Sequence, residues 1–159
     1  MAPGLLRCPL KPLRRLDEMD DRIPAQILML LSAGIILALG TIHLAYTFRG
    51  SKLTPRDPAL QVAMDHTSPV IARETTMWRC WVGFNASHSM GAILFGLVYG
   101  FLAATHAQLL FHSIFLLVVG LAMLGGFLVL GRVYWFSVPF RSIAVALACY
   151  LAGIAVALT

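Results

Sequence analysis

The chain has 159 residues, of which 59% are hydrophobic and only 12% are charged. A soluble domain carries about 25% charged residues, so this composition excludes an ordinary soluble domain and predicts an integral membrane protein. The net charge of +5 comes from basic residues near the N-terminus and between the apolar stretches, where Lys and Arg contact lipid headgroups. We therefore expect the lipid bilayer, and not nucleic acid, as the partner of these charges.

The first 23 residues form a polar tail in which basic and acidic residues are mixed and prolines lie near the start. We expect a flexible beginning and then a short interfacial helix over 13–21. Residues 24–159 are expected to form a single domain with four membrane spans.

The first apolar stretch, 24–48, contains no charged residue and is long enough to cross a bilayer. Pro24 suits the first position of a helix, and Gly50 is expected to end it. Gly34 and Ala38 form a small-xxx-small pair, which predicts close contact with another helix. No A-x-A cleavage site follows this stretch, so we expect it to remain in the mature protein.

The connection over 49–77 is long, and connections of this length are usually functional or ordered. Its middle carries the turn sequence Thr54-Pro55-Arg56-Asp57-Pro58. Residues 59–66 then predict a short amphipathic helix that lies at the membrane interface.

The longest run without Asp, Glu, Lys or Arg extends from Cys80 to Gly131. As one helix it would be about 78 Å long, more than twice a bilayer core of roughly 30 Å. We therefore predict two antiparallel spans, 78–104 and 108–131, joined by a short turn.

Two further patterns predict close helix packing. Gly96 and Gly100 form a GxxxG pair in the second span. The last span, 139–159, begins at Pro139 and carries an alanine-rich face. The members of this face are Ala144, Ala148, Ala152, Gly153 and Ala155. The predicted fold class is thus an all-α integral membrane four-helix bundle with a short interfacial helix in the first connection.

A polar cluster, from Asn85 to Ser89, lies near the start of the second span, and polar groups inside a membrane usually have a role. Counted from the ends of the spans, His43 lies ~7 Å and His88 ~13 Å below the surface that carries the long connection. The two histidines are therefore expected in the same leaflet, between the first two spans. Asn85 and His88 share one face of their helix.

Four interpretations of this cluster stay open. It either forms hydrogen bonds that hold the register of the helices, or it lines a pocket for a lipid-like or quinone-like molecule. A third interpretation is a haem or metal site with His43 and His88 as ligands, for which a third ligand is missing. The fourth is catalysis by a histidine, with Asp65 or Glu74 reaching in from the connection. The candidate ligand-binding residues are His43, Tyr46, Trp81, Asn85, Ser87, His88 and Ser89.

Two functions follow from these interpretations. The first is a non-enzymatic membrane component, either an accessory subunit or a bundle that binds a small apolar ligand, self-associated or part of a larger membrane complex. The alternative is a membrane redox protein or enzyme in which His43 and His88 bind haem or a metal. The sequence contains no G-x-S-x-G, HExxH or P-loop motif, so we name no catalytic residue.

The string from Trp81 to Gly91 reads W-x-G-F-N-x-S-H-S-x-G. In this string the chain resembles a group of small bacterial four-span membrane proteins that have no established activity. A histidine near the end of their first helix is matched here by His43. The resemblance implies a four-helix fold and, with a bacterial source, location in the inner membrane. It covers about a tenth of the chain and implies no cofactor.

Overall fold

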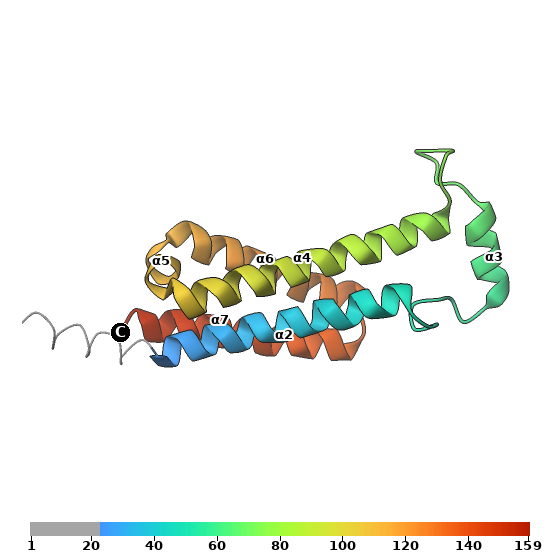
Figure 1. Ribbon diagram of the computed structural model, residues 1–159. Helices are drawn as coiled ribbons and strands as arrows, with labels where there is room; N and C mark the ends of the chain where they lie inside the picture. The colour runs from blue at the N-terminus through green and yellow to red at the C-terminus, as the bar shows by residue number, and fades with distance from the viewer. Residues whose placement is uncertain (1–22) are drawn as a thin grey trace, which may run out of the picture.

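The protein is an all-α bundle of four apolar helices (Figure 1). The computed structural model describes residues 23–159, and the interfacial helix expected over 13–21 lies outside that range. Four of the helices are long and apolar enough to cross a membrane. They are α2 (Ile23–Phe48), α4 (Met77–Thr105), α6 (Ile114–Tyr134) and α7 (Ser137–Ala157). The predicted fold class, an integral membrane four-helix bundle, is confirmed.

The long connection contains α3 (Pro58–His66), the short helix that the sequence predicts there. The helix begins where it does because Pro58 occupies the first turn and the Asp57 side chain accepts a hydrogen bond of 2.9 Å from the N–H of Ala59. Before it, Gly50 ends α2 with φ 81°, a conformation that favours glycine. Figure 1 shows α3 lying across the end of α2 and α4.

The third span differs from its predicted bounds of 108–131. Its first residues form a separate short helix, α5 (Ala107–His112), and α6 begins only at Ile114 and continues to Tyr134. The break falls at Ser113, whose backbone is extended at φ −90° and ψ 99°. Its Oγ accepts a hydrogen bond of 3.3 Å from the N–H of Leu116 and so caps the new helix. Ser113 therefore divides the predicted third span into α5 and α6, because it caps α6 within an apolar run.

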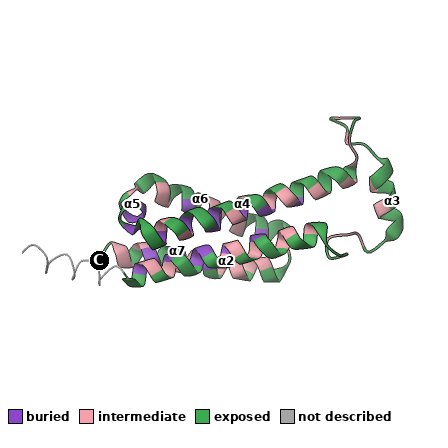
Figure 2. Cartoon of the chain, in the orientation of Figure 1, coloured by how far each residue is buried: buried purple, intermediate pink, exposed green. Residues whose placement is uncertain are grey.

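The core lies mainly between α2, α4 and α7. Figure 2 shows patches of buried residues along the bundle and none on α3. Buried positions recur three or four residues apart, as expected for one face of a helix. On α2 they are Ala25, Met29, Ser32, Ala33, Ile36 and Gly40. On α4 they are Asn85, Ser89, Ala92, Phe95, Gly96, Tyr99 and Ala103. The buried stripe of α4 therefore becomes polar toward the long connection.

Helices α2 and α4 pack most closely at two glycines. A Cβ atom at Gly96 would lie 2.6 Å from the Cβ of Leu37, and one at Gly40 would lie 2.9 Å from the Cβ of Ala92. The prediction that the GxxxG pair mediates close packing is confirmed at Gly96. Gly34 and Ala38 make no such contact within the described bundle, because both are exposed and no atom lies within 4 Å of a Cβ built at Gly34.

The alanine-rich face of α7 packs against α2 only in part. Gly153 is buried, and a Cβ there would lie 3.2 Å from the backbone oxygen of Ala25. Ala148, Ala152 and Ala155 are exposed. The buried face of α7 consists instead of Ile143, Ala146, Tyr150 and Gly153, which lie on the same side of the helix.

Helix α6 packs closely along α7, whereas its contact with α4 is made through large side chains. The Tyr99 hydroxyl on α4 donates a hydrogen bond of 2.6 Å to the carbonyl of Leu116. The Tyr150 hydroxyl on α7 donates one of 2.9 Å to the carbonyl of Leu117. Two tyrosines from different helices thus hold the first turn of α6.

Helices α2 and α4 are longer than α6 and α7, so their ends extend beyond the shorter pair at one end of the bundle. Helices α2 and α4 have 26 and 29 residues, whereas α6 and α7 have 21 each. At 1.5 Å per residue, the short helices are about 32 Å long and α4 is about 44 Å long. The first value matches a hydrocarbon core of about 30 Å, and the second matches a whole bilayer with its headgroups. Figure 1 shows α2 and α4 projecting past the α6–α7 turn.

Candidate functional site

The predicted polar residues meet where α2 and α4 begin to project past the α6–α7 turn. His43 lies near the end of α2, and Asn85 lies in the third turn of α4. His43 Nε2 and Asn85 Oδ1 are 3.0 Å apart, which makes a hydrogen bond between the two helices. Asn85 retains only 8% exposure, so this bond is largely shielded from its surroundings.

The direction of this bond follows from the second partner of Asn85. Its amide nitrogen donates a bond of 2.8 Å to the carbonyl of Trp81, so its oxygen is the atom that faces His43. His43 Nε2 therefore carries the hydrogen and donates it. Ser89, which is fully buried, donates from Oγ to the carbonyl of Asn85 at 2.7 Å and extends the polar group by one turn.

His88 lies next to His43 but makes a different set of contacts. The two imidazole rings meet edge to face with their centroids 5.7 Å apart. His88 also packs edge on against Phe127 at 5.3 Å and against Trp135 at 4.8 Å. Neither ring nitrogen of His88 has a hydrogen-bond partner among the described residues. The ring serves there as an aromatic packing group.

The other candidate residues lie outside this group. Trp81 Nε1 donates a bond of 3.0 Å to the carbonyl of Leu53, which fastens the long connection to α4. Ser87 is exposed, and its Oγ donates to the carbonyl of Phe84 on its own helix. Tyr46 is 43% exposed on α2. The structure therefore brings together His43, Asn85, His88 and Ser89. Tyr46 and Trp81 lie beside this group, whereas the Ser87 side chain points away from it and bonds to its own helix.

A cavity of about 240 Å³ lies beside the His43–Asn85 bond, between the end of α2, the following loop and the start of α4. We call it the connection pocket. Its lining residues are Tyr46, Thr47, Phe48, Gly50, Leu53, Thr54, Trp78, Trp81, Val82 and Asn85. Ligand pockets usually have about 300–1,000 Å³, so this one has room for the head of a molecule rather than for a whole drug-sized ligand.

The lining of the connection pocket is uncharged, since it contains no Lys, Arg, Asp or Glu, and it combines aromatic side chains with polar and aliphatic ones. The hydroxyls of its two threonines and the indole N–H of Trp81 have partners inside the chain, whereas the Tyr46 hydroxyl and the Trp78 indole N–H have none among the described residues. Thr47 Oγ1 donates to the carbonyl of His43, and Thr54 Oγ1 donates to the carbonyl of Ser51, both at 2.9 Å. Asn85 is the buried polar residue of the lining. Its primary amide has two hydrogens and two lone pairs, and the chain uses one of each, so one donor and one acceptor of this amide remain for a ligand.

The haem interpretation does not fit this arrangement. A macrocycle ligated by both histidines would have to lie between α2 and α4. These helices approach so closely at Gly40, one turn from His43, that a Cβ there would lie 3.0 Å from the backbone oxygen of Ser89. Residues 23–159 also contain no group of three His, Cys, Asp or Glu side chains that could hold a metal ion.

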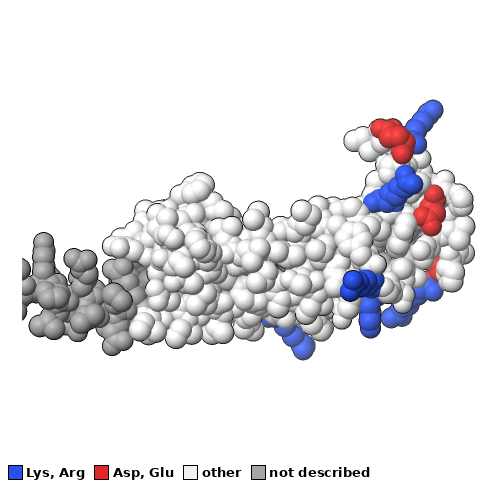
Figure 3. Space-filling model, viewed as in Figure 1, with Lys and Arg blue, Asp and Glu red and all other residues white. Residues whose placement is uncertain are grey.

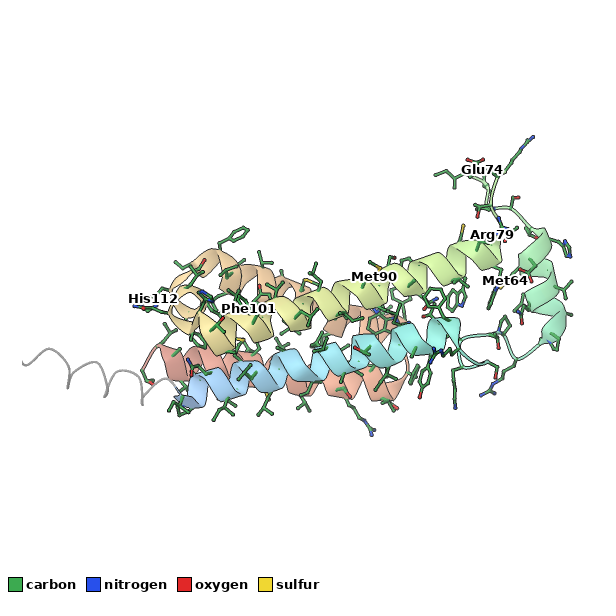
Figure 4. All side chains as sticks on the ribbon, viewed as in Figure 1. Met64, Glu74, Arg79, Met90, Phe101 and His112 are labelled. Carbon is green, nitrogen blue, oxygen red and sulfur yellow. The ribbon has the colours of Figure 1, made fainter. Side chains whose placement is uncertain are left out.

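The two carboxylates considered for catalysis lie on the connection. Asp65 is exposed on α3, and Glu74 is exposed in the loop that follows. Figure 4 shows Glu74 at the far side of that loop, farther from the bundle than Arg79. Neither residue lines the connection pocket, so the geometry does not pair a carboxylate with the histidines.

Sequence reasoning missed two aromatic residues that pack against His88, namely Phe127 and Trp135. Both come from α6 and the turn after it, about 40 residues or more from His88, and no spacing rule connects positions so far apart. The aromatic and basic segment 132–136 is typical of membrane interfaces, and this pattern predicts only that Trp135 lies at the edge of the leaflet that holds the histidines. Its contact with His88 shows that the cluster lies at the level of the α6–α7 turn.

No family model, curated protein or solved structure matches the chain. The likeness to small four-span proteins in residues 81–91 therefore stays a prediction.

Proposed function

We propose that the protein is a non-catalytic membrane component that binds the head of a small, neutral, lipid-soluble molecule in the connection pocket. The observation that carries this proposal is the buried Asn85 amide, which lines an uncharged cavity with four aromatic side chains and retains one free donor and one free acceptor. Aromatic side chains together with a few placed polar groups are typical of sites for small ligands.

The chemistry of the lining favours a neutral head that carries a carbonyl or hydroxyl group. A charged head would lose hydration against aromatic walls without meeting an opposite charge. A quinone-like ring meets the requirement, because its carbonyl accepts from the amide nitrogen and its faces pack against Trp78 and Tyr46. The rest of such a molecule would extend from the pocket, whose volume of about 240 Å³ is small.

His43 supports this site by positioning Asn85 rather than by contacting the ligand. It does not line the connection pocket, and its Nε2 hydrogen holds the amide oxygen at 3.0 Å. A positioning role predicts that His43→Gln, which keeps a donor, retains more binding than His43→Leu.

A binding titration tests the proposal. The purified protein in detergent is titrated with a short-chain quinone while tryptophan emission is recorded, since Trp78 and Trp81 line the pocket. We expect saturable quenching in the natural chain. Asn85→Leu is expected to weaken binding at least about tenfold, as the loss of about 1.4 kcal/mol or more does.

Ser87→Ala is the matched control, because Ser87 lies two residues from Asn85 but is exposed and bonds only to its own helix. It should bind like the natural chain. Quenching that never saturates, or equal affinity in Asn85→Leu and Ser87→Ala at equal helix content, would refute a quinone-like ligand at this site.

Assembly and location are part of the same proposal. The exposed alanines of α7, Ala148, Ala152 and Ala155, support self-association or docking into a larger membrane complex, because small residues let helices approach closely in lipid. The likeness to bacterial four-span proteins supports location in the bacterial inner membrane. The mass of the detergent-solubilised protein, compared between the natural chain and Ala152→Leu, tests the self-association.

A further inference from the structure

The loop between α3 and α4, residues 67–76, carries two neighbouring aliphatic side chains that no other part of residues 23–159 covers. Val70 has a relative exposure of 108% and Ile71 of 94%, the highest values among the large hydrophobic residues in this range. Isolated exposed apolar residues are common, but two adjacent ones that contact almost nothing indicate a surface that meets another apolar phase. We propose that this loop inserts its tip into the interface of the bilayer beside the bundle.

Two backbone hydrogen bonds fix the shape of the loop so that these side chains point outward. The N–H of Met77 donates a bond of 2.8 Å to the carbonyl of Thr67, which closes the base of the loop where α4 begins. At the tip, the N–H of Ala72 donates a bond of 3.2 Å to the carbonyl of Pro69. The two aliphatic residues occupy the central positions of this four-residue turn, so their side chains point away from the loop.

The position of the loop places its tip at the depth of the lipid headgroups. Helix α4 is about 44 Å long, which equals the thickness of a bilayer with both headgroup layers, so its first turn lies in one of these layers. Figure 1 shows the loop beside this first turn, on the side away from α2, whereas α3 lies across the end of the bundle. The tip therefore lies over lipid next to the bundle, not over the bundle itself.

Charge also favours lipid as the phase that the loop tip contacts. Five of the seven described Lys and Arg residues lie in the long connection or the first turn of α4, at this end of the bundle, where basic side chains contact headgroups (Figure 3). They are Arg49, Lys52, Arg56, Arg73 and Arg79. The loop itself carries Arg73 and Glu74, so its net charge is zero and its insertion depends on apolar burial. A bilayer of neutral phosphatidylcholine should therefore suffice.

A fluorescent label at the tip tests this inference. The full chain, with Cys8, Cys80 and Cys149 replaced by Ser, receives Val70→Cys and an environment-sensitive dye, and is reconstituted into phosphatidylcholine vesicles. We expect blue-shifted emission, protection from aqueous iodide and strong quenching by lipids that carry a nitroxide at the headgroup boundary. The control is Asp65→Cys on exposed α3, where the same dye should be quenched by iodide and not by the lipids.

A second variant separates insertion from a preference of the dye for lipid. Adding Ile71→Asp to the labelled Val70→Cys chain should reverse the blue shift while helix content stays unchanged, because Ile71 is almost free of contacts. Equal iodide access at positions 70 and 65 would overturn the proposal. So would a tip label that is shielded from iodide but not quenched by the lipids, since a second copy or another protein would then cover it.

Discussion

At the scale of single residues, Asn85 connects two helices and the connection pocket. Its oxygen accepts from His43 on α2, and its nitrogen donates to the carbonyl of Trp81 on α4. A lone asparagine inside a membrane would leave costly unpaired groups. Here the chain satisfies half of its hydrogen-bonding capacity, which holds the amide in one orientation.

A double-mutant cycle should detect this bond. Replacing His43 by Ala, Asn85 by Ala, and both together is expected to reveal a coupling of about 0.6 kcal/mol in the free energy of unfolding, the average for hydrogen bonds between membrane helices. The measurement is reversible unfolding in mixed detergent micelles.

The matched cycle pairs His43→Ala with Ser87→Ala. Ser87 bonds only to the carbonyl of Phe84 on its own helix, so its coupling to His43 should be close to zero. If both cycles give the same coupling, the contact between His43 and Asn85 contributes nothing specific to stability.

At the scale of helices, the contact between α2 and α4 depends on the absence of side chains at Gly40 and Gly96. Lipid supplies little hydrophobic drive for two apolar helices to associate, so close van der Waals packing and hydrogen bonds hold them together. The polar cluster lies at the end of the same contact, because Ser89 and Asn85 continue the face that contains Gly96 and Ala92. Spacing at the glycines therefore controls the distance between His43 and Asn85.

Gly96→Ala is expected to destabilise the protein by about 1–3 kcal/mol, as overpacking of a filled core does. The added Cβ would lie 2.6 Å from the Cβ of Leu37 and 2.8 Å from the carbonyl oxygen of Ala33, and the backbone oxygen cannot rotate away. Unfolding in mixed micelles measures the loss.

Gly91→Ala on the same helix provides the comparison. No atom lies within 4 Å of a Cβ built at Gly91, so the substitution should leave stability unchanged or raise it slightly through better helix propensity. A loss at position 91 as large as that at position 96 would show that flexibility of α4, and not close approach to α2, explains both glycines.

At the scale of the whole molecule, the unequal lengths of the spans place the polar cluster near the boundary between hydrocarbon and headgroups. His88 packs against Trp135, which follows the end of α6, and α6 is about as long as the hydrocarbon core is thick. The connection pocket lies above this level, beside the projecting ends of α2 and α4. Polar groups are therefore less costly here than they would be at the middle of the bilayer.

The depth of two tryptophans in the bilayer tests whether α4 extends past the α6–α7 turn. Trp78 precedes His88 by ten residues on α4, so it should lie about 15 Å along the helix from the level of Trp135. In variants that retain a single tryptophan, lipids with a quencher deep in the acyl chain should quench Trp135 more strongly than Trp78. Equal quenching profiles at the two positions would mean that the α6–α7 turn and the start of α4 lie at one depth.

Local pattern was sufficient for several features of this protein. Uncharged runs of membrane-spanning length predict α2, α4 and α7, since the thickness of the bilayer fixes how many apolar residues a helix needs. Turn residues before 59–66 predict α3, and Gly50 marks the end of α2. Distances from the helix ends predict that His43 and His88 lie at the same end of the bundle, because a helix rises by a constant 1.5 Å per residue, and the two rings are indeed neighbours.

Other features depend on how the helices turn toward one another. The sequence contains several small-residue pairs, and nothing local distinguishes Gly96, which contacts α2, from Gly34, which is open. The same holds for Ala152, which is exposed although it belongs to the alanine-rich face. In lipid both sides of such a helix are apolar, so hydropathy does not indicate which face is buried.

The sequence by itself determined the class of the protein, the number of helices long enough to span a membrane and the end of the bundle where its two central histidines lie, because charge-free length and helical rise are local quantities. Only the tertiary structure decided that His43 bonds to Asn85, that His88 packs among Phe127 and Trp135, and that an uncharged pocket adjoins them. These contacts join residues from three helices and a loop, and their geometry depends on the rotation of each helix about its own axis.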